Sequence, residues 1–302
     1  MKKPLLLSAA LILLSGFGAA PTVSSSTMPL STQRLVQTPE APAVREAVPS
    51  QEVQLLGAGT EPRQPLRFVP VQNARQTIRI TMNSDLAMTI GGYAIPAIPT
   101  PSVEMTMDMA VTAVQPNGDI RMEFTYTDAS VEAAEGVPPE VVESMRQQLQ
   151  QLVGVGGFTV IDSRGRTKEA SFSLPESLGA GFQQAFEQML QSLDQLSSPF
   201  PEEAVGVGAT WQVTKSLDLM GMTLNQVETY ELVERQGDAV VLNVGFSQRA
   251  DAQPWALPGL PPEATVNLNA FDALGSGQVS LALDRVMPII ATMSSNANME
   301  WR

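Results

Sequence analysis

Methionine is the residue type in this chain whose spacing first suggests chemistry. Met105, Met107 and Met109 stand at alternate positions of the segment VEMTMDMAV, residues 103–111. On a β-strand such side chains share one face, roughly 7 Å apart, and flexible thioethers at that spacing can converge on a soft ion such as Cu(I). The same spacing is typical of the buried face of a strand, because methionine fills irregular gaps in a core.

The surrounding residues favour the core interpretation. The chain has no histidine and no cysteine, the residues that usually complete a copper site. Asn117-Gly118 predicts a β-hairpin that returns through residues 120–126. The apolar face of the returning strand would consist of Ile120, Met122, Phe124 and Tyr126. We therefore expect no metal site and no cofactor.

The methionine face of this hairpin leaves two alternatives open. It is either a filled core or the lining of a pocket for an apolar ligand, since methionine-rich surfaces repack around varied shapes. The residues of that ligand site would be Met105, Met107, Met109, Met122 and Phe124.

Composition excludes several classes of function. Without histidine and cysteine the chain cannot build a Ser-His-Asp triad, a thiolate nucleophile, a disulfide or an ordinary zinc site. We therefore expect a non-catalytic protein. The 31 acidic and 18 basic residues give a formal net charge of −13, which repels phosphate backbones and predicts that nucleic acid is not a partner.

The N-terminus has the pattern of a secretory signal peptide over residues 1–20. Lys2 and Lys3 precede an apolar run, and small residues follow it. A retained N-terminal anchor is the alternative, and no later stretch is long and apolar enough to span a membrane. Residues 21–65, rich in Pro, Ser and Ala, predict a disordered tether. We expect an extracytoplasmic protein of the periplasm, the cell envelope or the secreted fraction.

Residues 66–302 predict one β-rich domain of the α+β class. Alternating segments indicate curved antiparallel sheets, and two amphipathic stretches, about 138–153 and 179–196, indicate covering helices. Three pairs of short motifs recur in the same order, which predicts an internal duplication with units of about 66–175 and 203–302. The pairs are Gly118-Asp119 with Gly237-Asp238, VPPE (137–140) with LPPE (260–263), and GVG (154–156) with GSG (275–277).

The stretches LRFVPVQNARQTIRI (66–80) and FPEEAVGVGATW (200–211) resemble an uncharacterised family of exported bacterial proteins. The resemblance covers about Leu66 to Trp301 and implies a duplicated β-rich domain of unknown function, without catalytic residues to carry over. The first copy departs from the pattern, with Gln72 and Arg75 where the second has Gly208 and Trp211. A fainter likeness, at the level of fold alone, is to periplasmic lipoprotein carriers, which bind acyl chains.

Together these features predict an exported, non-catalytic protein that binds an apolar small molecule or lipid between its sheet and helices. The alternative is a structural or protein-interaction module of the cell envelope with a solid core, whose partners would be other envelope proteins.

Overall fold

The computed structural model describes residues 51–83, 85–90, 93–173, 199–219, 222–255 and 266–301, and most of them lie in β-strands. A single helix, α1 (Pro139–Gln150), occurs among these residues. The expected signal peptide (1–20), the first part of the expected tether (21–50) and the expected second helix (179–196) lie outside the described residues.

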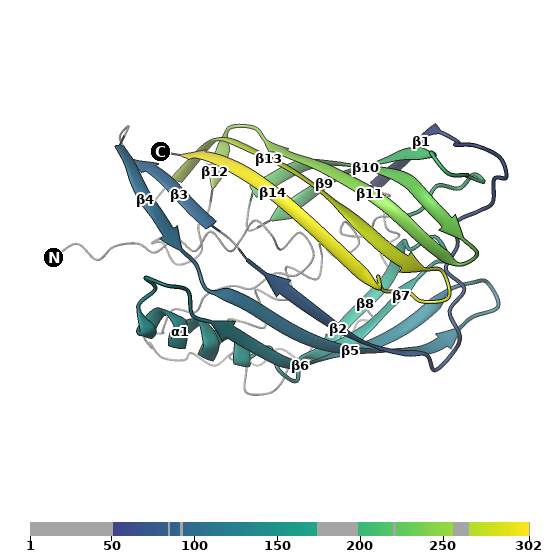
Figure 1. Ribbon diagram of the computed structural model, residues 1–302, viewed down its shortest axis with the longest axis horizontal. Helices are drawn as coiled ribbons and strands as arrows, with labels where there is room; N and C mark the ends of the chain where they lie inside the picture. Colours follow the sequence, from purple (N-terminus) through teal and green to yellow (C-terminus); the bar gives the residue numbers. More distant parts are fainter. Residues whose placement is uncertain are drawn as a thin grey trace, which may run out of the picture.

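The strands form two curled antiparallel sheets that lie over one another as two layers (Figure 1). We name them the N-terminal and the C-terminal sheet. The N-terminal sheet has the order β2 (Arg75–Met82), β5 (Ser102–Val114), β6 (Ile120–Glu132), β7 (Gly156–Ile161), β8 (Thr167–Ser173). A two-stranded hairpin, β3 (Asp85–Ile90) and β4 (Tyr93–Pro99), extends from it between β2 and β5.

The C-terminal sheet has seven strands. The central path runs β1 (Gln51–Gly57), β9 (Thr210–Leu219), β10 (Met222–Gln236), β11 (Ala239–Ala250), β13 (Val266–Ala282). Two further strands, β12 (Gln253–Trp255) and β14 (Ile290–Trp301), both pair with β13.

The hairpin predicted at Asn117-Gly118 is confirmed as the turn between β5 and β6. Gly118 has φ +86, a conformation that glycine adopts without steric cost. The Asn117 side chain accepts a hydrogen bond from the backbone N–H of Asp119 at 3.0 Å and donates one to its carboxylate at 2.8 Å. The predicted alternation of β6 is also confirmed, and a bulge near Thr127 then keeps Ala129 and Val131 buried.

The first predicted helix is confirmed as α1. Pro138 and Pro139 begin it, where a missing N–H costs nothing, and Glu140 lies in the first turn near the positive end of the helix dipole. Gly154, with φ +90, follows its C-terminus. Leu149 packs against the buried cluster of the N-terminal sheet, so α1 covers part of that face.

The two sheets share one strand order. In the N-terminal sheet β2, β5, β6, β7 and β8 are neighbours in chain order, and β9, β10, β11, β13 and β14 repeat this meander in the C-terminal sheet. The α1 crossover between β6 and β7 corresponds to the chain between β11 and β13. The hairpin glycines Gly118 and Gly237, which paired the two halves in the sequence, occupy equivalent turns with positive φ.

The equivalence extends to irregular features. Asn73 and Gly208, with φ +68 and +81, each precede the first strand of their meander, β2 and β9. Their N–H groups donate to Val111 O and Leu232 O respectively, both at 2.7 Å. Val111 and Leu232 in turn each border a register shift of the central hairpin, in β5 and in β10. The two sheets thus have a bulge, and a turn that holds it, at matching positions.

This correspondence corrects two details of the sequence alignment by one residue. Asn73 and Gln76, rather than Gln72 and Arg75, stand opposite Gly208 and Trp211. Similarly, Gly157 rather than Gly156 is the equivalent of Gly277. Gly157 pairs with Phe124 of β6, and Gly277 with Val244 of β11.

The prediction that residues 51–65 belong to a disordered tether is wrong. Residues Gln51–Gly57 form β1, which pairs antiparallel with β9, and Gln64 forms a bridge with Val205. The alternation of Val53 and Leu55 with polar residues suits a half-buried edge strand. Its partner lies far along the chain, so no local pattern revealed the pairing.

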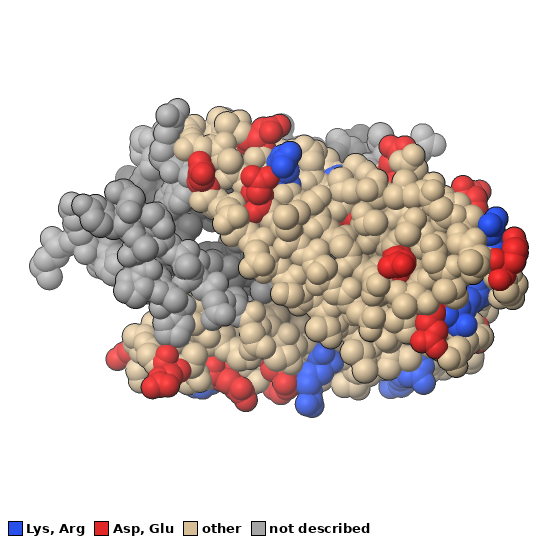
Figure 2. Space-filling view, turned by 45° about the horizontal axis from the view of Figure 1, so that its top comes forward, with Lys and Arg blue, Asp and Glu red and all other residues tan. Residues whose placement is uncertain are grey.

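The apolar residues that face the space between the layers form three buried clusters. One belongs to the N-terminal sheet, and Val286 of the turn between β13 and β14 joins it. The C-terminal sheet carries two, one around Trp211 and Leu232 and the other around Leu224 and Phe271. Figure 2 shows the outer surface of the molecule: a broad face with few charged side chains, although the chain has a net charge of −13.

Candidate functional site

The five residues predicted to line a ligand site lie together in the N-terminal sheet. Each is between 2% and 8% exposed, and all belong to one cluster of buried side chains: Met105, Met107, Met109, Met122 and Phe124. The register sets Met109 opposite Phe124 and Met107 opposite Tyr126. The structure therefore brings the predicted residues together on a buried face, and their binding of a ligand stays a prediction.

Aromatic rings extend this methionine face along β6. The Phe124 ring meets Phe172 of β8 edge to face, with centroids 5.0 Å apart, and meets Tyr126 at 6.4 Å. Burial raises the pKa of the Tyr126 hydroxyl, so this side chain stays neutral throughout the physiological range. The face is thus soft, apolar and uncharged.

The C-terminal sheet differs, because buried polar side chains cross its inward face. We call these four residues the buried polar row: Lys215, Gln226, Glu228 and Gln248. Lys215, Gln226 and Gln248 lie at one level on β9, β10 and β11, where the register pairs them in succession. Half-buried Gln51 of β1 continues the same level beside Lys215.

Glu228 is the centre of the hydrogen bonds in this row. Lys215 Nζ lies 2.7 Å from Glu228 Oε1, and the two side chains are 1% and 10% exposed. Gln226 Nε2 donates to the same oxygen, and the Tyr230 hydroxyl donates to Glu228 Oε2 at 2.8 Å. Gln248 Nε2 donates to Gln226 Oε1 at 2.6 Å, which ties the third strand to the other two.

Trp211 lies beside this network and carries a polar group without a partner. Its ring stacks on Tyr230, with centroids 5.3 Å apart and planes 10° apart. The residue is 1% exposed, and no group in the described part of the chain accepts a hydrogen bond from its Nε1–H. Leaving a buried donor unpaired costs about 1–3 kcal/mol, so an acceptor next to this N–H group would stabilise the protein.

Apolar clusters flank the buried polar row on both sides along the sheet. On one side are Trp211, Leu232 and Leu242, and on the other Met222, Leu224 and Phe271. The inward surface of this sheet therefore alternates apolar, polar and apolar in bands. Such a surface can hold a molecule that has both an apolar part and a hydrogen-bonding group.

The N-terminal sheet shows what the same positions contain without the polar row. Rows are counted along the central hairpin from the shared bulge, where Val111 and Leu232 correspond. Four residues before Val111 and Leu232 in the chain, Met107 corresponds to Glu228. The remaining counterparts lie in the next row, two residues further from the bulge. These are Met105 for Gln226, Ile80 for Lys215 and Ala129 for Gln248.

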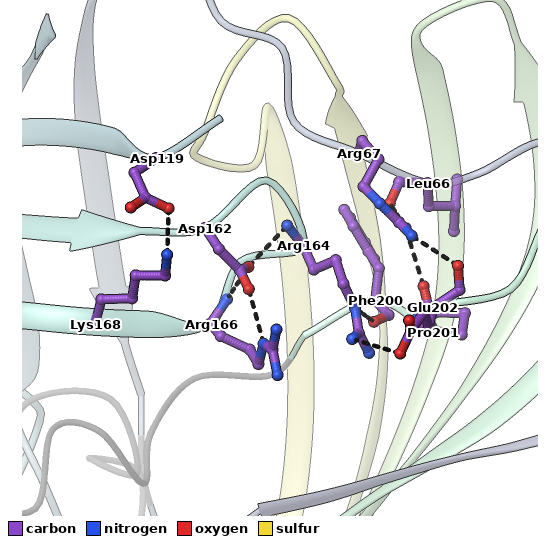
Figure 3. A network of polar contacts seen from close by, with 10 residues as sticks. All are labelled: Leu66, Arg67, Asp119, Asp162, Arg164, Arg166, Lys168, Phe200, Pro201 and Glu202. Atoms are coloured by element: carbon purple, nitrogen blue, oxygen red, sulfur yellow. Dashed lines mark hydrogen bonds and ion pairs between the residues drawn. The ribbon is translucent and has the colours of Figure 1, made fainter. Parts of the chain in front are cut away.

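A second polar network joins the two sheets at their edge (Figure 3). Arg67 donates to the backbone oxygens of Pro201 and Glu202, at 3.0 and 2.7 Å, and Arg164 Nε donates to Phe200 O at 2.8 Å. These guanidinium groups hold the chain where it enters the second half. Their hydrogen bonds go to backbone carbonyls, and Arg164 also pairs with the Glu202 carboxylate at 3.6 Å, which favours a structural role for this network.

Asp162 organises the β7–β8 turn within that network. Its carboxylate accepts from Arg166 Nε at 2.7 Å and from the backbone N–H groups of Arg164 and Arg166, at 2.9 and 3.0 Å. Burial by itself raises the pKa of Asp162, but the hydrogen bonds and charge of Arg166 and the backbone N–H of Arg164 outweigh it, so the pKa is lowered.

We expect Asp162→Asn to lower the free energy of unfolding at neutral pH by about 1–3 kcal/mol, because it removes charge-assisted hydrogen bonds. Since the folded-state pKa is lowered, the contribution of Asp162 is present above its ordinary value of 3.8 and is lost as pH falls below it. Urea denaturation at several pH values measures both effects. The variant should lose less stability than the wild type on acidification; parallel losses would contradict the assignment.

The described residues contain neither a metal-ligand cluster nor a membrane-spanning helix. That part of the chain has no group of three or more Asp or Glu side chains placed to hold a metal ion. In the same residues no helix is both long and apolar enough to cross a membrane.

Comparison of the chain with protein-family models, curated proteins and solved structures finds no match. The family resemblance expected from the sequence therefore stays a prediction.

Sequence reasoning missed the buried polar row although a signal was present. On β9, Lys215 lies an even number of residues from Trp211 and Val213, so the three share one face of the strand. On β10, Gln226 and Glu228 share a face with Leu224 in the same way. Polar residues at positions that alternation assigns to the core are a sign of a buried network. The register that sets the three strands level could not be read from the sequence.

Proposed function

We propose that this protein is an exported, non-catalytic binding protein that holds an apolar molecule between its two sheets. The observation that carries the proposal is the contrast between the inward faces. A methionine face lines one sheet, and bands of apolar and polar residues line the other. A fold that needed only a core would not require a buried ion pair, because replacing such a pair by apolar residues is often neutral or stabilising.

The absence of histidine and cysteine from the sequence supports a binding role over catalysis, since it removes the commonest general bases and nucleophiles. The pattern of residues 1–20 supports an extracytoplasmic location. The matching strand order, bulge and preceding turn support an internal duplication as the origin of the two sheets. In that case the copies have kept their backbone and diverged in their inward side chains.

The proposal is tested by gentle purification of the full chain followed by native mass spectrometry. We expect a fraction of the protein to retain an apolar molecule, and the stripped protein to bind a fluorescent fatty-alcohol probe. Excess unlabelled alcohol should displace the probe, which shows that the site is saturable. A single mass equal to that of the bare chain, together with no saturable probe binding, would refute the binding function.

A second candidate function is a protein-interaction module with a solid core, and strand β14 favours it. Among the described strands β14 pairs with β13 alone, so its other edge is open to strand addition. Ile289 and Ile290 at its start are 54% and 65% exposed. If the experiment above finds no bound molecule and no probe binding, the interaction module becomes the better-supported function.

A further inference from the structure

The buried polar row is not required by the architecture that contains it. The N-terminal sheet has the same strand order and the same hairpin bulge, and it places Ile80, Met105 and Met107 where the C-terminal sheet has Lys215, Gln226 and Glu228. The apolar solution therefore exists in the same molecule. Burying a lysine and a glutamate costs several kcal/mol per ion before their attraction offsets it. A row that is costly, and that the corresponding positions of the other sheet do without, points to a ligand.

The charges of the row indicate what kind of group it can receive. Lys215 and Glu228 carry opposite charges 2.7 Å apart, with side chains 1% and 10% exposed. A carboxylate or phosphate placed here would compete with Glu228 for Lys215 and would bring a second negative charge next to a buried carboxylate. A cation would bring a second positive charge next to buried Lys215. Since uncompensated buried charge is strongly disfavoured, the row suits an uncharged group.

The hydrogen-bonding groups narrow the choice further. The indole N–H of Trp211 can only donate, and within the described residues it has no acceptor. Trp211 stacks on Tyr230, whose hydroxyl donates to Glu228, so the indole adjoins the row. An oxygen of a hydroxyl, ester or amide group on the ligand would supply the missing acceptor.

We propose that the buried polar row is the headgroup site of the apolar ligand and that it selects an uncharged, oxygen-bearing headgroup. The ligand class is that of long-chain alcohols and acylglycerols, as distinct from fatty acids and phospholipids. The apolar part of the ligand lies along the flanking cluster of Met222, Leu224 and Phe271 and the facing methionines. This inference rests on the proposed binding function and adds the chemical class of its ligand.

The test compares palmitate, hexadecanol and monopalmitoylglycerol, which share one chain length and differ in the headgroup. Each displaces a fluorescent fatty-alcohol probe from the stripped full chain at neutral pH. We expect the two uncharged ligands to bind at least about tenfold more tightly than palmitate, a difference typical of one buried charge or hydrogen bond. This comparison uses the wild type and does not depend on any variant.

Two variants localise the preference to the row. Glu228→Gln removes the negative charge of the row and keeps Lys215, which lies 2.7 Å from that carboxylate in the wild type. We expect it to shift the preference towards palmitate, because the carboxylate of palmitate can then pair with Lys215. Trp211→Phe keeps an aromatic ring on Tyr230 and removes the N–H, so it should weaken hexadecanol binding several-fold. The matched control is Arg249→Gln with Asp272→Asn, an exposed pair on β11 and β13 with side chains 76% and 52% exposed.

The possible results separate the two proposals. If palmitate binds as tightly as hexadecanol, the headgroup inference is wrong while the binding function stands. The same conclusion follows if the folded Glu228→Gln variant, checked by circular dichroism, keeps the wild-type preference. If none of the three ligands displaces the probe and the probe itself does not bind, both proposals fail together.

Discussion

Replacing Lys215 by isoleucine is expected to lower the free energy of unfolding by about 3–5 kcal/mol. The substitution leaves Glu228, whose side chain is 10% exposed, without its cationic partner at 2.7 Å. The remaining donors, Gln226 and Tyr230, are neutral and cannot balance the charge. Such a loss is a large share of the total stability of a typical domain, about 5–15 kcal/mol.

The paired replacement of Lys215 by isoleucine and Glu228 by methionine should cost less than either single change. It removes both charges and adopts the residues that the N-terminal sheet uses at the equivalent positions. We expect a loss of about 1–3 kcal/mol, because no charge is left unpaired but Gln226 and Tyr230 lose Glu228 as their acceptor. Equilibrium urea denaturation of the wild type, the two single variants and the double variant forms a double-mutant cycle.

The exposed pair of Arg249 and Asp272, 2.9 Å apart, is the control for this cycle. Because surface ion pairs contribute about 0–1 kcal/mol, Asp272→Asn should change stability little. Equal effects at the buried and the exposed pair would show that Lys215 and Glu228 are not desolvated as the structure indicates. A double variant as unstable as the single ones would show that the row is essential for folding.

Gly277→Ala is expected to lower the free energy of unfolding by about 3 kcal/mol, the upper end of the range for overfilled sites. A Cβ atom at this position of β13 would lie 2.0 Å from the backbone oxygen of Thr292 on β14. Gly157 of β7 is its counterpart, where a Cβ atom would lie 2.1 Å from Ser171 O on β8, so Gly157→Ala should have a similar effect. Both contacts involve backbone atoms, which cannot move without breaking the sheet.

Gly245→Ala is the matched control for these glycines. Gly245 lies on β11, and the nearest atom to an added Cβ is 4.0 Å away. The substitution should be neutral or slightly stabilising, by up to about 1 kcal/mol, because alanine restricts the unfolded chain. Thermal unfolding followed by circular dichroism ranks the three variants. If Gly157→Ala were tolerated and Gly277→Ala were not, the equivalence of the two sheets at these positions would be wrong.

The features that the sequence predicts well are those encoded by local pattern. The turn at Asn117-Gly118 and the alternation of Met105, Met107 and Met109 each depend on neighbouring residues, and the structure has both. The matching turn glycines Gly118 and Gly237 were visible for the same reason, because such glycines are required by backbone conformation. Gln72 was aligned with Gly208 in error because the first half has asparagine, Asn73, where the second half has glycine. Both residue types can adopt positive φ, so the motif alone did not mark the position.

The features that the sequence does not predict depend on which strands become neighbours. Lys215, Gln226 and Gln248 are a row only because β9, β10 and β11 pair in one register. A shift of one residue would turn the same side chains to the outward face. Strand β1 was missed on the same ground, since Val53 and Leu55 alone are too short a pattern to identify a strand in a segment rich in proline and serine.

Strand β1 has a consequence for the order in which this molecule can be assembled. It precedes the whole N-terminal sheet in the chain, yet Gln51 pairs with Lys215, more than 160 residues later. All strands of the N-terminal sheet lie in the chain between β1 and its partner β9, so β1 can pair only by closing a loop around that whole sheet. Closing so long a loop adds an entropic barrier and raises the contact order, which slows folding. Folding of the two halves is thereby linked, because β1, which precedes the N-terminal sheet, can pair only once β9 has formed.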